Sequence, residues 1–337
     1  MKIGFVVNHP TQFEVPFYQY VALHHPRHLF KVFYLKEDNN GHYDKELGQN
    51  IKWGFNLYAD YPYSFLGKEP LKAFDIELQN ENFDLIIING YKNQYSGYAA
   101  ICKQKNITVA LKLDTVLFNQ PLWKIWLRKL FLKKEYAVFD YFFVTGKVSK
   151  DYLLEMGISP ERIGIFSYCT DNEFFKKENV SKNQELSALY KQHNERIILS
   201  VAKFMERESP WDILKAFTKL NQKDLSLVLI GDGVEKEALQ KYASKFLDLN
   251  IHFPGYIKYT DLPAYYQISD IFIHAAKDEP WGVSVQEAIG GNCFVICSDK
   301  VGAARDLIKD GKNGFTYSFG YYDELADKIS KALTISS

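Results

Sequence analysis

The sequence of 337 residues contains no hydrophobic run approaching the roughly 20 apolar residues that cross a bilayer. Its first residues form a short apolar run without a small-residue cleavage site, which does not fit a secretory signal. Only four cysteines are present, none with the spacing of a zinc site, and this favours a reduced compartment. We therefore expect a cytoplasmic protein.

An excess of charge is also missing, because 41 basic and 41 acidic side chains give a net charge of zero. The chain as a whole has no attraction for nucleic acid, so nucleic acid is not an expected partner and any basic site must be local. The sequence has no Asp-x-Asp pattern and no cluster of His and Cys with ligand spacing. These absences predict a site without a metal ion.

What the sequence does contain is an alternation of apolar runs and helical patterns, at a length that suits two domains. The run FDLIIIN at 83–89 is continuous rather than alternating, which indicates a strand buried on both faces and hence a parallel sheet. In the first half we expect a helix at 15–23 and strands at 2–7, 30–35, 83–89, 107–113 and 141–145.

A polar segment at 176–195 reads as a linker with one helix, after which the pattern starts again. Strands are expected at 197–202, 226–230, 251–253, 271–274 and 294–297. Helices are expected at 211–220, up to 246, and at 262–267, 284–289 and 322–333. The prediction is an α/β protein with domains 1–175 and 176–337, two doubly wound sheets whose carboxyl ends face a cleft, the usual ligand site.

The most informative segment is EPWGVSVQE, in which Glu279 follows an expected strand and Glu287 lies in the next helix. Gly282 allows close approach of a ligand to the backbone, and the free N–H groups of Val283 and Ser284 at the start of the helix favour a phosphate. Two carboxylates and a helix N-terminus suit a nucleoside diphosphate sugar. The alternative is that Glu279 caps the helix and Glu287 lies on its solvated face.

This segment resembles the donor site of the GT-B glycosyltransferases of family 4. The resemblance extends from Ser200 to about Phe315, and it continues more weakly into NHPTQFEVP and FSYCTDNEFF of the first half. The residues that carry it are Glu279, Trp281, Gly282, Glu287, Ala288, Gly291, Ser298, Gly302 and the DGKNG at 310–314.

The resemblance implies a role for each matching residue. Glu279 would contact hydroxyls of the donor sugar, and Glu287 would hold the ribose. The backbone at 282–284 would bind the diphosphate, while Tyr256 and Ile257 would edge the nucleobase pocket. No cofactor is implied beyond the nucleotide-sugar donor.

In the family, a basic residue after the first strand of this domain and a Lys five positions later clamp the diphosphate. Lys203 fits the first place, but Glu208 occupies the second. We expect Arg207 to supply the missing charge, because Arg binds phosphate bidentately; the alternative is that Arg207 and Glu208 are simply solvated. Gly231, in a Gly-Asp-Gly turn, resembles the turn beneath the donor, and a purely structural turn is the alternative.

In the first half, His9 and Asp114 each follow an expected strand and are candidates for contact with the acceptor or the transferred sugar. The alternatives are a loop histidine bonded to nearby backbone and an N-capping aspartate. The segment 122–134, LWKIWLRKLFLKK, is a basic amphipathic helix of the kind that lies on anionic bilayers. A helix packed on its own sheet would have a similar sequence pattern. The two alternatives for this segment are therefore contact with the inner face of a membrane and packing on the sheet.

Family 4 implies a retaining hexosyl- or related transferase that acts on a glycan or lipid-linked acceptor, as in polysaccharide biosynthesis. No residue is placed as a nucleophile, so we expect front-face transfer, with Glu279, Lys203, Arg207, Asp114 and His9 as the catalytic set. The alternatives are a non-catalytic nucleotide-sugar-binding or scaffolding domain, favoured by Glu208, and a nucleotide-sugar epimerase. The final helix is a candidate for packing back toward the first domain.

Overall fold

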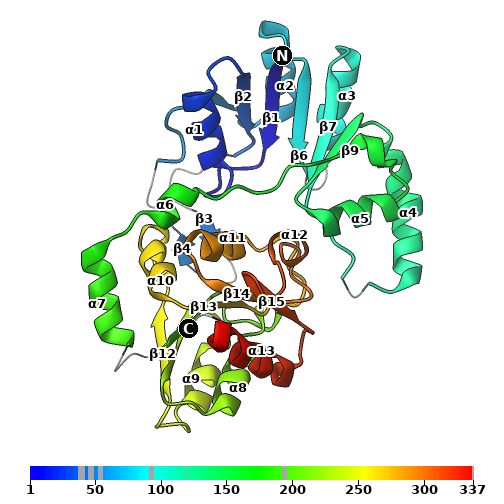
Figure 1. Ribbon diagram of the computed structural model, residues 1–337. Helices are drawn as coiled ribbons and strands as arrows, with labels where there is room; N and C mark the ends of the chain where they lie inside the picture. The colour runs from blue at the N-terminus through cyan, green and yellow to red at the C-terminus, as the bar shows by residue number, and fades with distance from the viewer. Residues whose placement is uncertain are drawn as a thin grey trace. The chain divides into compact units, whose positions relative to one another are not determined.

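The chain forms two compact units, each built on a sheet of parallel strands (Figure 1). The first unit comprises Met1–Gly41 and Phe55–Cys169, and the second comprises His42–Gly54 and Thr170–Ser337. The computed structural model describes residues 1–36, 42–44, 49–51, 56–90, 95–118, 120–191 and 196–335.

The division between the units falls slightly before the boundary expected after residue 175. Phe175 accounts for the difference, because its fully buried ring packs edge-on against Tyr259 and Tyr266 of the second unit. Two helices follow Cys169, α6 (Asn172–Lys176) and α7 (Val180–Tyr190). Helix α7 is the one helix expected within the segment 176–195, whereas α6 begins before that segment and was missed.

The sheet of the first unit has the order β5-β2-β1-β6-β7-β8-β9, and its neighbouring strands are parallel. The order reverses between β1 and β6, so their carboxyl ends open a crevice of the kind that binds ligands in such sheets. The strands are β1 (Lys2–Val7), β2 (Leu29–Tyr34), β5 (Tyr63–Phe65), β6 (Leu85–Asn89), β7 (Thr108–Leu113), β8 (Tyr141–Val144) and β9 (Ile163–Ile165).

Helices cover both faces of this sheet. On one face, Phe74, Tyr98 and Leu153 come from three helices and join a single apolar core with the strands. On the other face, Tyr18 of α1 packs against Phe5 of β1. The helices are α1 (Val15–His24), α2 (Pro70–Asn80), α3 (Tyr95–Gln104), α4 (Leu122–Tyr136) and α5 (Lys147–Glu155).

The second unit has a sheet of order β12-β11-β10-β13-β14-β15, the order of a dinucleotide-binding α/β sheet. The strand order reverses between β10 and β13. These two strands are parallel neighbours, and Ile198 of β10 pairs with Ile271 of β13. The strands are β10 (Arg196–Val201), β11 (Leu225–Ile230), β12 (Asn250–Gly255), β13 (Ile271–His274), β14 (Phe294–Ser298) and β15 (Gly314–Tyr317).

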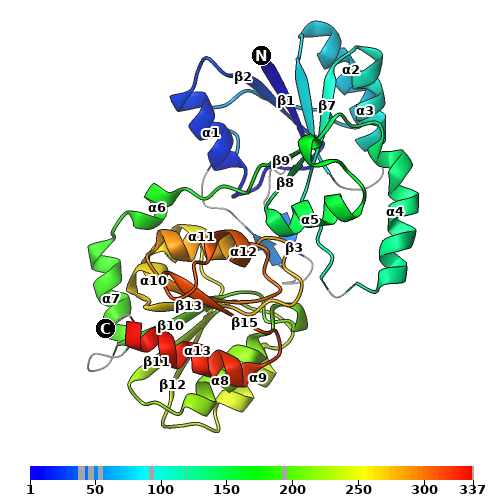
Figure 2. The same cartoon turned by 45° about the vertical axis from the view of Figure 1, so that its right-hand side comes forward.

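Besides α6 and α7, the helices of the second unit lie in two layers, with α8, α9 and α13 on one side of the sheet and α10, α11 and α12 on the other (Figure 2). They are α8 (Pro210–Leu220), α9 (Lys236–Ala243), α10 (Leu262–Ile268), α11 (Val283–Gly290), α12 (Ala304–Leu307) and α13 (Tyr322–Ile335). A short antiparallel pair, β3 (His42–Asp44) and β4 (Gln49–Ile51), is grouped with this unit.

The final helix, α13, packs within the second unit. Its buried residues Leu325, Ala326, Ile329 and Ala332 join the core of that unit, and α8 is its main helical neighbour. The apolar stripe of this helix is thus used by its own sheet.

The α/β class and the expected strands are confirmed, with ends that differ by one or two residues. The helix expected to run to 246 ends at Ala243. The sequence analysis missed α2, α3 and α5, and it missed β5, β9 and β15, whose three or four residues are too few for a periodic signal. Within the described residues, no helix is both long and apolar enough to cross a bilayer.

Candidate functional site

The candidate donor site lies at the carboxyl ends of β10 and β13, where the strand order of the second unit reverses. The segment after β10 carries Lys203 and a 3₁₀ turn at Glu206–Glu208, and the segment after β13 carries Glu279. The N–H of Lys277 donates to the carbonyl of Arg207 at 2.7 Å, which ties the two segments together. The fold therefore brings residues about 70 positions apart into one site.

The loop that carries Glu279 is fixed by backbone bonds to the loop after β14. The N–H of Glu279 donates to the carbonyl of Lys300 at 3.0 Å, and the N–H of Gly302 donates back to the carbonyl of Glu279 at 2.9 Å. Only glycine fits at 302, because a Cβ there would lie 1.9 Å from the carbonyl oxygen of Pro280. Close packing against Pro280 therefore explains why a glycine stands at position 302, one of the residues that carry the family resemblance.

Helix α11 begins beside Glu279. Gly282 is its N-cap with a φ of +94°, a conformation that glycine adopts without strain. One oxygen of Glu279 accepts a hydrogen bond of 3.2 Å from the N–H of Trp281, which orients the carboxylate, and burial raises the pKa of that carboxyl. The N-cap position of α11 receives no side-chain hydrogen bond, so Glu279 does not cap the helix as the alternative supposed. Val283 and Ser284 are half-buried at the first turn.

Glu287 lies one turn further along α11 and is only 5% exposed. Its carboxylate accepts a hydrogen bond of 2.9 Å from the hydroxyl of Tyr266 in α10, and burial raises its pKa to about 7. The alternative that Glu287 lies on a solvated face is therefore wrong.

Arg207 and Glu208 form an ion pair. The guanidinium of Arg207 donates to one oxygen of Glu208 at 3.0 and 3.2 Å, and Glu208 is buried while Arg207 is half-exposed. The alternative that both are solvated is wrong for Glu208. The charge that Arg207 was expected to offer a diphosphate is shared with Glu208, and Lys203 lies half-buried nearby in the chain.

Gly231 lies in a turn that packs on the backbone of the segment carrying Lys203. A Cβ at Gly231 would lie 1.9 Å from the carbonyl oxygen of Ala202, and the N–H of Phe204 donates to the carbonyl of Asp232 at 2.9 Å. The turn therefore has a structural role. The N–H of Gly231 also donates to the carbonyl of Gly255. The next two residues are Tyr256, which is exposed, and Ile257, which is half-buried.

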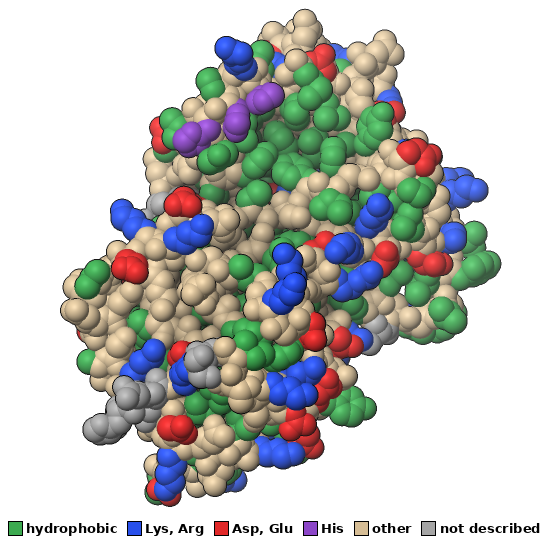
Figure 3. Space-filling view, in the orientation of Figure 1, with side chains coloured by type: hydrophobic (Ala, Val, Ile, Leu, Met, Phe, Trp, Pro, Cys, Tyr) green, Lys and Arg blue, Asp and Glu red, His purple; other side chains and the backbone are tan. Residues whose placement is uncertain are grey.

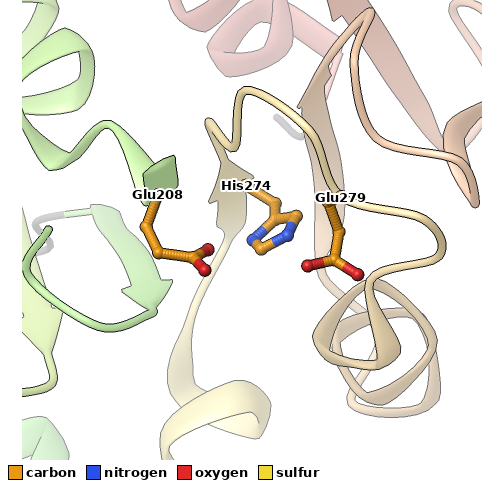
Figure 4. Close-up of side chains that lie close together, drawn as sticks. All are labelled: Glu208, His274 and Glu279. Atoms are coloured by element: carbon orange, nitrogen blue, oxygen red, sulfur yellow. The ribbon is translucent and has the colours of Figure 1, made fainter. Parts of the chain in front are cut away.

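The side chains of Glu208, His274 and Glu279 meet at this strand end. One potential ligand atom of each lies within 4.8 Å of the others, and the imidazole lies between the two carboxylates (Figure 4). His274 is the last residue of β13, and sequence reasoning missed it because a histidine inside an apolar strand gives no separate signal.

The first unit contains a cavity of about 730 Å³ at the carboxyl ends of β1, β6 and β7. His9 and Asp114 both line it, as expected from their positions after strands. The ring Nδ1 of His9 lies 3.1 Å from the carbonyl oxygen of Pro10, so the backbone contact of the alternative reading is present as well. Asp114 accepts a hydrogen bond of 3.0 Å from Tyr168. It caps no helix, since α4 begins only after Pro121.

Three further polar residues of this cavity were missed from the sequence. Lys112 and Glu14 form a buried ion pair at 3.3 Å, and Asn89 donates to the same oxygen of Glu14. The ammonium of Lys112 also lies 4.4 Å from the centre of the Phe166 ring. Lys112 lies inside β7, whose mostly apolar sequence predicts a buried strand and gives no sign of a functional lysine.

Helix α4 turns most of its large apolar side chains outward. Ile125 and Leu132 pack against the core of the first unit, whereas Trp123 and Trp126 are each 61% exposed. Leu122, Leu130 and Phe131 are exposed as well. In the space-filling view, hydrophobic side chains and basic ones gather over α4 at the right-hand edge (Figure 3).

Comparison with known families identifies the second unit. Residues 181–336 match the model of a family described as glycosyl transferases group 1. This segment is a group 1 glycosyl transferase domain. The match extends through the whole of α13 and includes both expected glutamates, Glu279 and Glu287.

Curated relatives are similar to the chain over part of their length. Alpha-monoglucosyldiacylglycerol synthase of Acholeplasma laidlawii is 30% identical over 130 residues, which cover 37% of this chain and 32% of that protein. An uncharacterized glycosyltransferase of Methanocaldococcus jannaschii is 26% identical over 210 residues, which cover 61% of this chain and 51% of that protein. The chain thus spans about a third to a half of the length of these relatives.

Solved glycosyltransferase structures share the whole architecture. The Anabaena protein HepE, in its complex with UDP and glucose, is 17% identical to the chain and aligns with a TM-score of 0.71. The alignment covers 100% of this chain and 93% of that one. The chain therefore has the GT-B fold, built from two Rossmann-like domains.

Proposed function

We propose that this glycosyl transferase moves a sugar, with retention of anomeric configuration, from a nucleoside diphosphate sugar to a hydroxyl of a glycan or lipid-linked acceptor. The observation that carries the proposal is the position of Glu279, the N-terminus of α11 and Lys203 after the carboxyl ends of the neighbouring strands β10 and β13, in a segment that matches group 1 glycosyl transferases. A hydroxyl ligand, an anion-binding helix end and a cation are the groups that a nucleotide sugar requires.

In the donor site, Glu279 accepts hydrogen bonds from hydroxyls of the sugar, and the backbone at 282–284 binds the diphosphate. Glu287 holds the ribose once a ligand replaces part of its contact with Tyr266. Tyr256 and Ile257 edge the base, above the turn at Gly231. The HepE structure contains UDP and glucose, which makes uridine diphosphate the first nucleotide to test.

The chemistry is front-face transfer. The bond between the anomeric carbon and the diphosphate oxygen breaks, and the acceptor hydroxyl attacks from the same side and forms the new glycosidic bond. Its proton passes to the departing diphosphate oxygen. Lys203, Arg207 and the N-terminus of α11 stabilise the negative charge that develops there.

The acceptor binds in the cavity of the first unit. His9 and Asp114 are the polar groups we assign to its hydroxyls, supported by their position on the wall of a cavity large enough for a sugar. Lys112, Glu14 and Asn89 add donors and acceptors that suit a polyhydroxyl ligand.

Membrane contact through α4 is part of this proposal. Trp123 and Trp126 face outward beside basic side chains, and aromatic and basic residues together favour the interface of an anionic bilayer. The alternative of a helix packed entirely on its sheet leaves these exposed rings without a role. A lipid-linked acceptor would be reached at such a surface.

A second candidate function is nucleotide-sugar binding without transfer, and a third is epimerisation of the donor. The buried Glu208 beside Arg207 favours binding without transfer, since it reduces the positive charge available to a leaving diphosphate. An epimerase would convert the donor when no acceptor is present, whereas a transferase would leave the sugar unaltered.

Thermal unfolding of the purified protein with a panel of nucleoside diphosphates and nucleotide sugars tests the proposal. A ligand that binds only the folded state stabilises it by about 2.7 kcal/mol at a hundred times its Kd. We expect a selective rise in Tm with one diphosphate, lost in Glu287→Ala and kept in Glu237→Ala, which changes an exposed carboxylate of α9. The absence of any shift would overturn the donor assignment.

A further inference from the structure

The cavity of the first unit has lysines on its wall that the proposed function does not yet use. Lys36 is the second residue after β2, and Lys68 is the third residue after β5; both line the cavity together with Lys112 of β7. Strands β2 and β5 are parallel neighbours, so the segments that follow them leave the sheet at the same end. Lys36 and Lys68 therefore reach the cavity from adjacent strand ends.

The backbone places both lysines at the cavity wall. The N–H of Lys36 donates to the carbonyl of Asn8 at 2.9 Å, which ties the segment after β2 to the loop after β1. Gly67 turns the chain between β5 and α2 with a φ of +66°, a conformation that glycine adopts without strain. Gly67 and Lys68 both belong to the cavity wall. Each lysine thus extends from a defined backbone position.

The three lysines differ in their partners. Lys112 is buried and is committed to Glu14, at 3.3 Å. Lys36 and Lys68 are exposed, and neither ammonium is paired with a carboxylate of any residue that the structure describes. One solvated lysine at a protein surface needs no explanation. Two on the wall of one cavity set the charge that a ligand meets there.

The charge of the cavity is positive. Among the described residues, its wall has two carboxylates, Glu14 and Asp114. Glu14 is balanced by Lys112, and Asp114 accepts its hydrogen bond from the neutral hydroxyl of Tyr168. Three lysines and two carboxylates leave a charge of +1 with His9 neutral, in a chain whose formal net charge is zero. A concave wall concentrates such a field, which favours an anionic ligand.

We propose that the acceptor sugar bound in this cavity carries a phosphate or a carboxylate, and that Lys36 and Lys68 bind this anionic group. The inference deepens the proposed function and rests on its assignment of the acceptor to the first unit. An ammonium is a compact charge with three N–H donors, which suits the oxygens of either anion. His9 and Asp114 remain for the sugar hydroxyls. The two lysines select the acceptor and take no part in the transfer itself.

The selectivity comes from charge. A neutral sugar leaves both ammonium groups hydrated and gains nothing from them, whereas an anion forms charge-assisted hydrogen bonds with them. One such bond changes the affinity on the order of 10-fold. Because the two lysines are exposed, salt screens their attraction over a distance of about 10 Å at 0.1 M. The preference for an anion should therefore be greatest at low salt.

Binding is measured first without any donor. Glucose 6-phosphate and glucuronate are the anionic probes, glucose is the neutral probe, and each is titrated into the full chain and followed by NMR of the ligand. We expect both anions to bind at least about 10-fold more tightly than glucose, with a difference that shrinks as salt is added. The anion that binds more tightly identifies the group as phosphate or carboxylate.

Substitutions assign the preference to the two lysines. Lys36→Gln and Lys68→Gln should each lower the affinity for the anions on the order of 10-fold and leave the affinity for glucose unchanged. Lys68→Arg keeps the charge and should keep most of the affinity. Lys72→Gln is the matched control, because Lys72 is an exposed lysine of α2 that does not line the cavity. Thermal unfolding establishes that each variant is folded.

Three outcomes would overturn the proposal. The first is equal affinity of the wild-type chain for glucose and both anions, and the second is unchanged anion binding in both glutamine variants. The third is a loss of UDP binding in these variants as large as the loss of anion binding, because Lys36 and Lys68 would then serve the donor. Failure of every nucleotide to bind, with lysine-dependent anion binding intact, would instead contradict the proposed function.

Discussion

The hydroxyl of Tyr266 donates a 2.9 Å hydrogen bond to the carboxylate of Glu287, and both side chains are buried. The pair joins α10 to α11 beneath the candidate donor site. Burial raises the pKa of Glu287 from 4.5 to about 7, and the hydrogen bond from Tyr266 opposes this rise. The folded chain therefore holds a proton that the unfolded chain has already released near neutral pH.

This pKa predicts a loss of stability as the pH rises. Between about pH 4.5 and 7 the folded state binds more protons at Glu287 than the unfolded state does, so the free energy of unfolding falls with pH in that window. The total is on the order of 3 kcal/mol. Urea unfolding at a series of pH values measures it, and Glu287→Gln should remove this part of the slope.

A second variant checks the cause. Tyr266→Phe deletes the hydrogen bond that favours the ionised carboxylate, so the pKa of Glu287 should rise further and the loss of stability should extend to higher pH. A pH dependence identical in the wild type and Glu287→Gln would show that Glu287 is not the group responsible.

Turnover should depend strongly on the carboxylate of Glu279. We expect Glu279→Gln to lower kcat on the order of 100-fold, because an amide cannot provide the charged acceptor that the sugar hydroxyls require. Release of nucleoside diphosphate from the preferred donor measures it. Glu206→Gln is the control, and near-normal turnover in Glu279→Gln would count against the whole assignment.

The buried pair of Lys112 and Glu14 predicts an asymmetric response to substitution. Lys112→Met leaves Glu14 charged and buried without its partner, so the chain should lose about 3–5 kcal/mol of stability. The double variant Lys112→Met with Glu14→Gln should recover part of that loss, because Gln can still accept the hydrogen bond from Asn89. Calorimetric unfolding of the three proteins gives the comparison, and equal losses in the single and double variants would contradict it.

Helix α4 should direct the protein to anionic bilayers. We expect sedimentation with vesicles of anionic phospholipid, decreasing with added salt, since each basic residue near such a surface contributes about 1 kcal/mol. The double variant Trp123→Ser with Trp126→Ser should remain in the supernatant. Leu247→Ser, which removes an exposed leucine of the second unit, should sediment like the wild type.

The parts of the site that lie close together in sequence could be predicted from it. Glu279 and Gly282 share one loop and one helix start, so their spacing carries the information. The strands were predictable for the same reason, because runs such as Leu85–Asn89 are buried on both faces and apolar throughout.

The parts that depend on tertiary pairing could not be predicted. Glu208 meets His274 only because β10 pairs with β13, and no sequence feature states which strands are neighbours. Lys112 was hidden inside a strand, and its partner Glu14 is the residue before α1, far from it in the chain. The direction in which α4 faces was likewise open, since Ile125 and Trp126 are adjacent and only packing decides which of them is buried.

The turn at Gly231 presses on the backbone that carries Lys203 so closely that no other residue fits there. A segment held in this way keeps one conformation before a ligand arrives, so its binding is preorganised and loses little entropy. The same tightness limits how the protein can diverge. Under the proposed function, a change of nucleotide preference would arise in outward side chains such as Tyr256 and Ile257 rather than in the turn at Gly231.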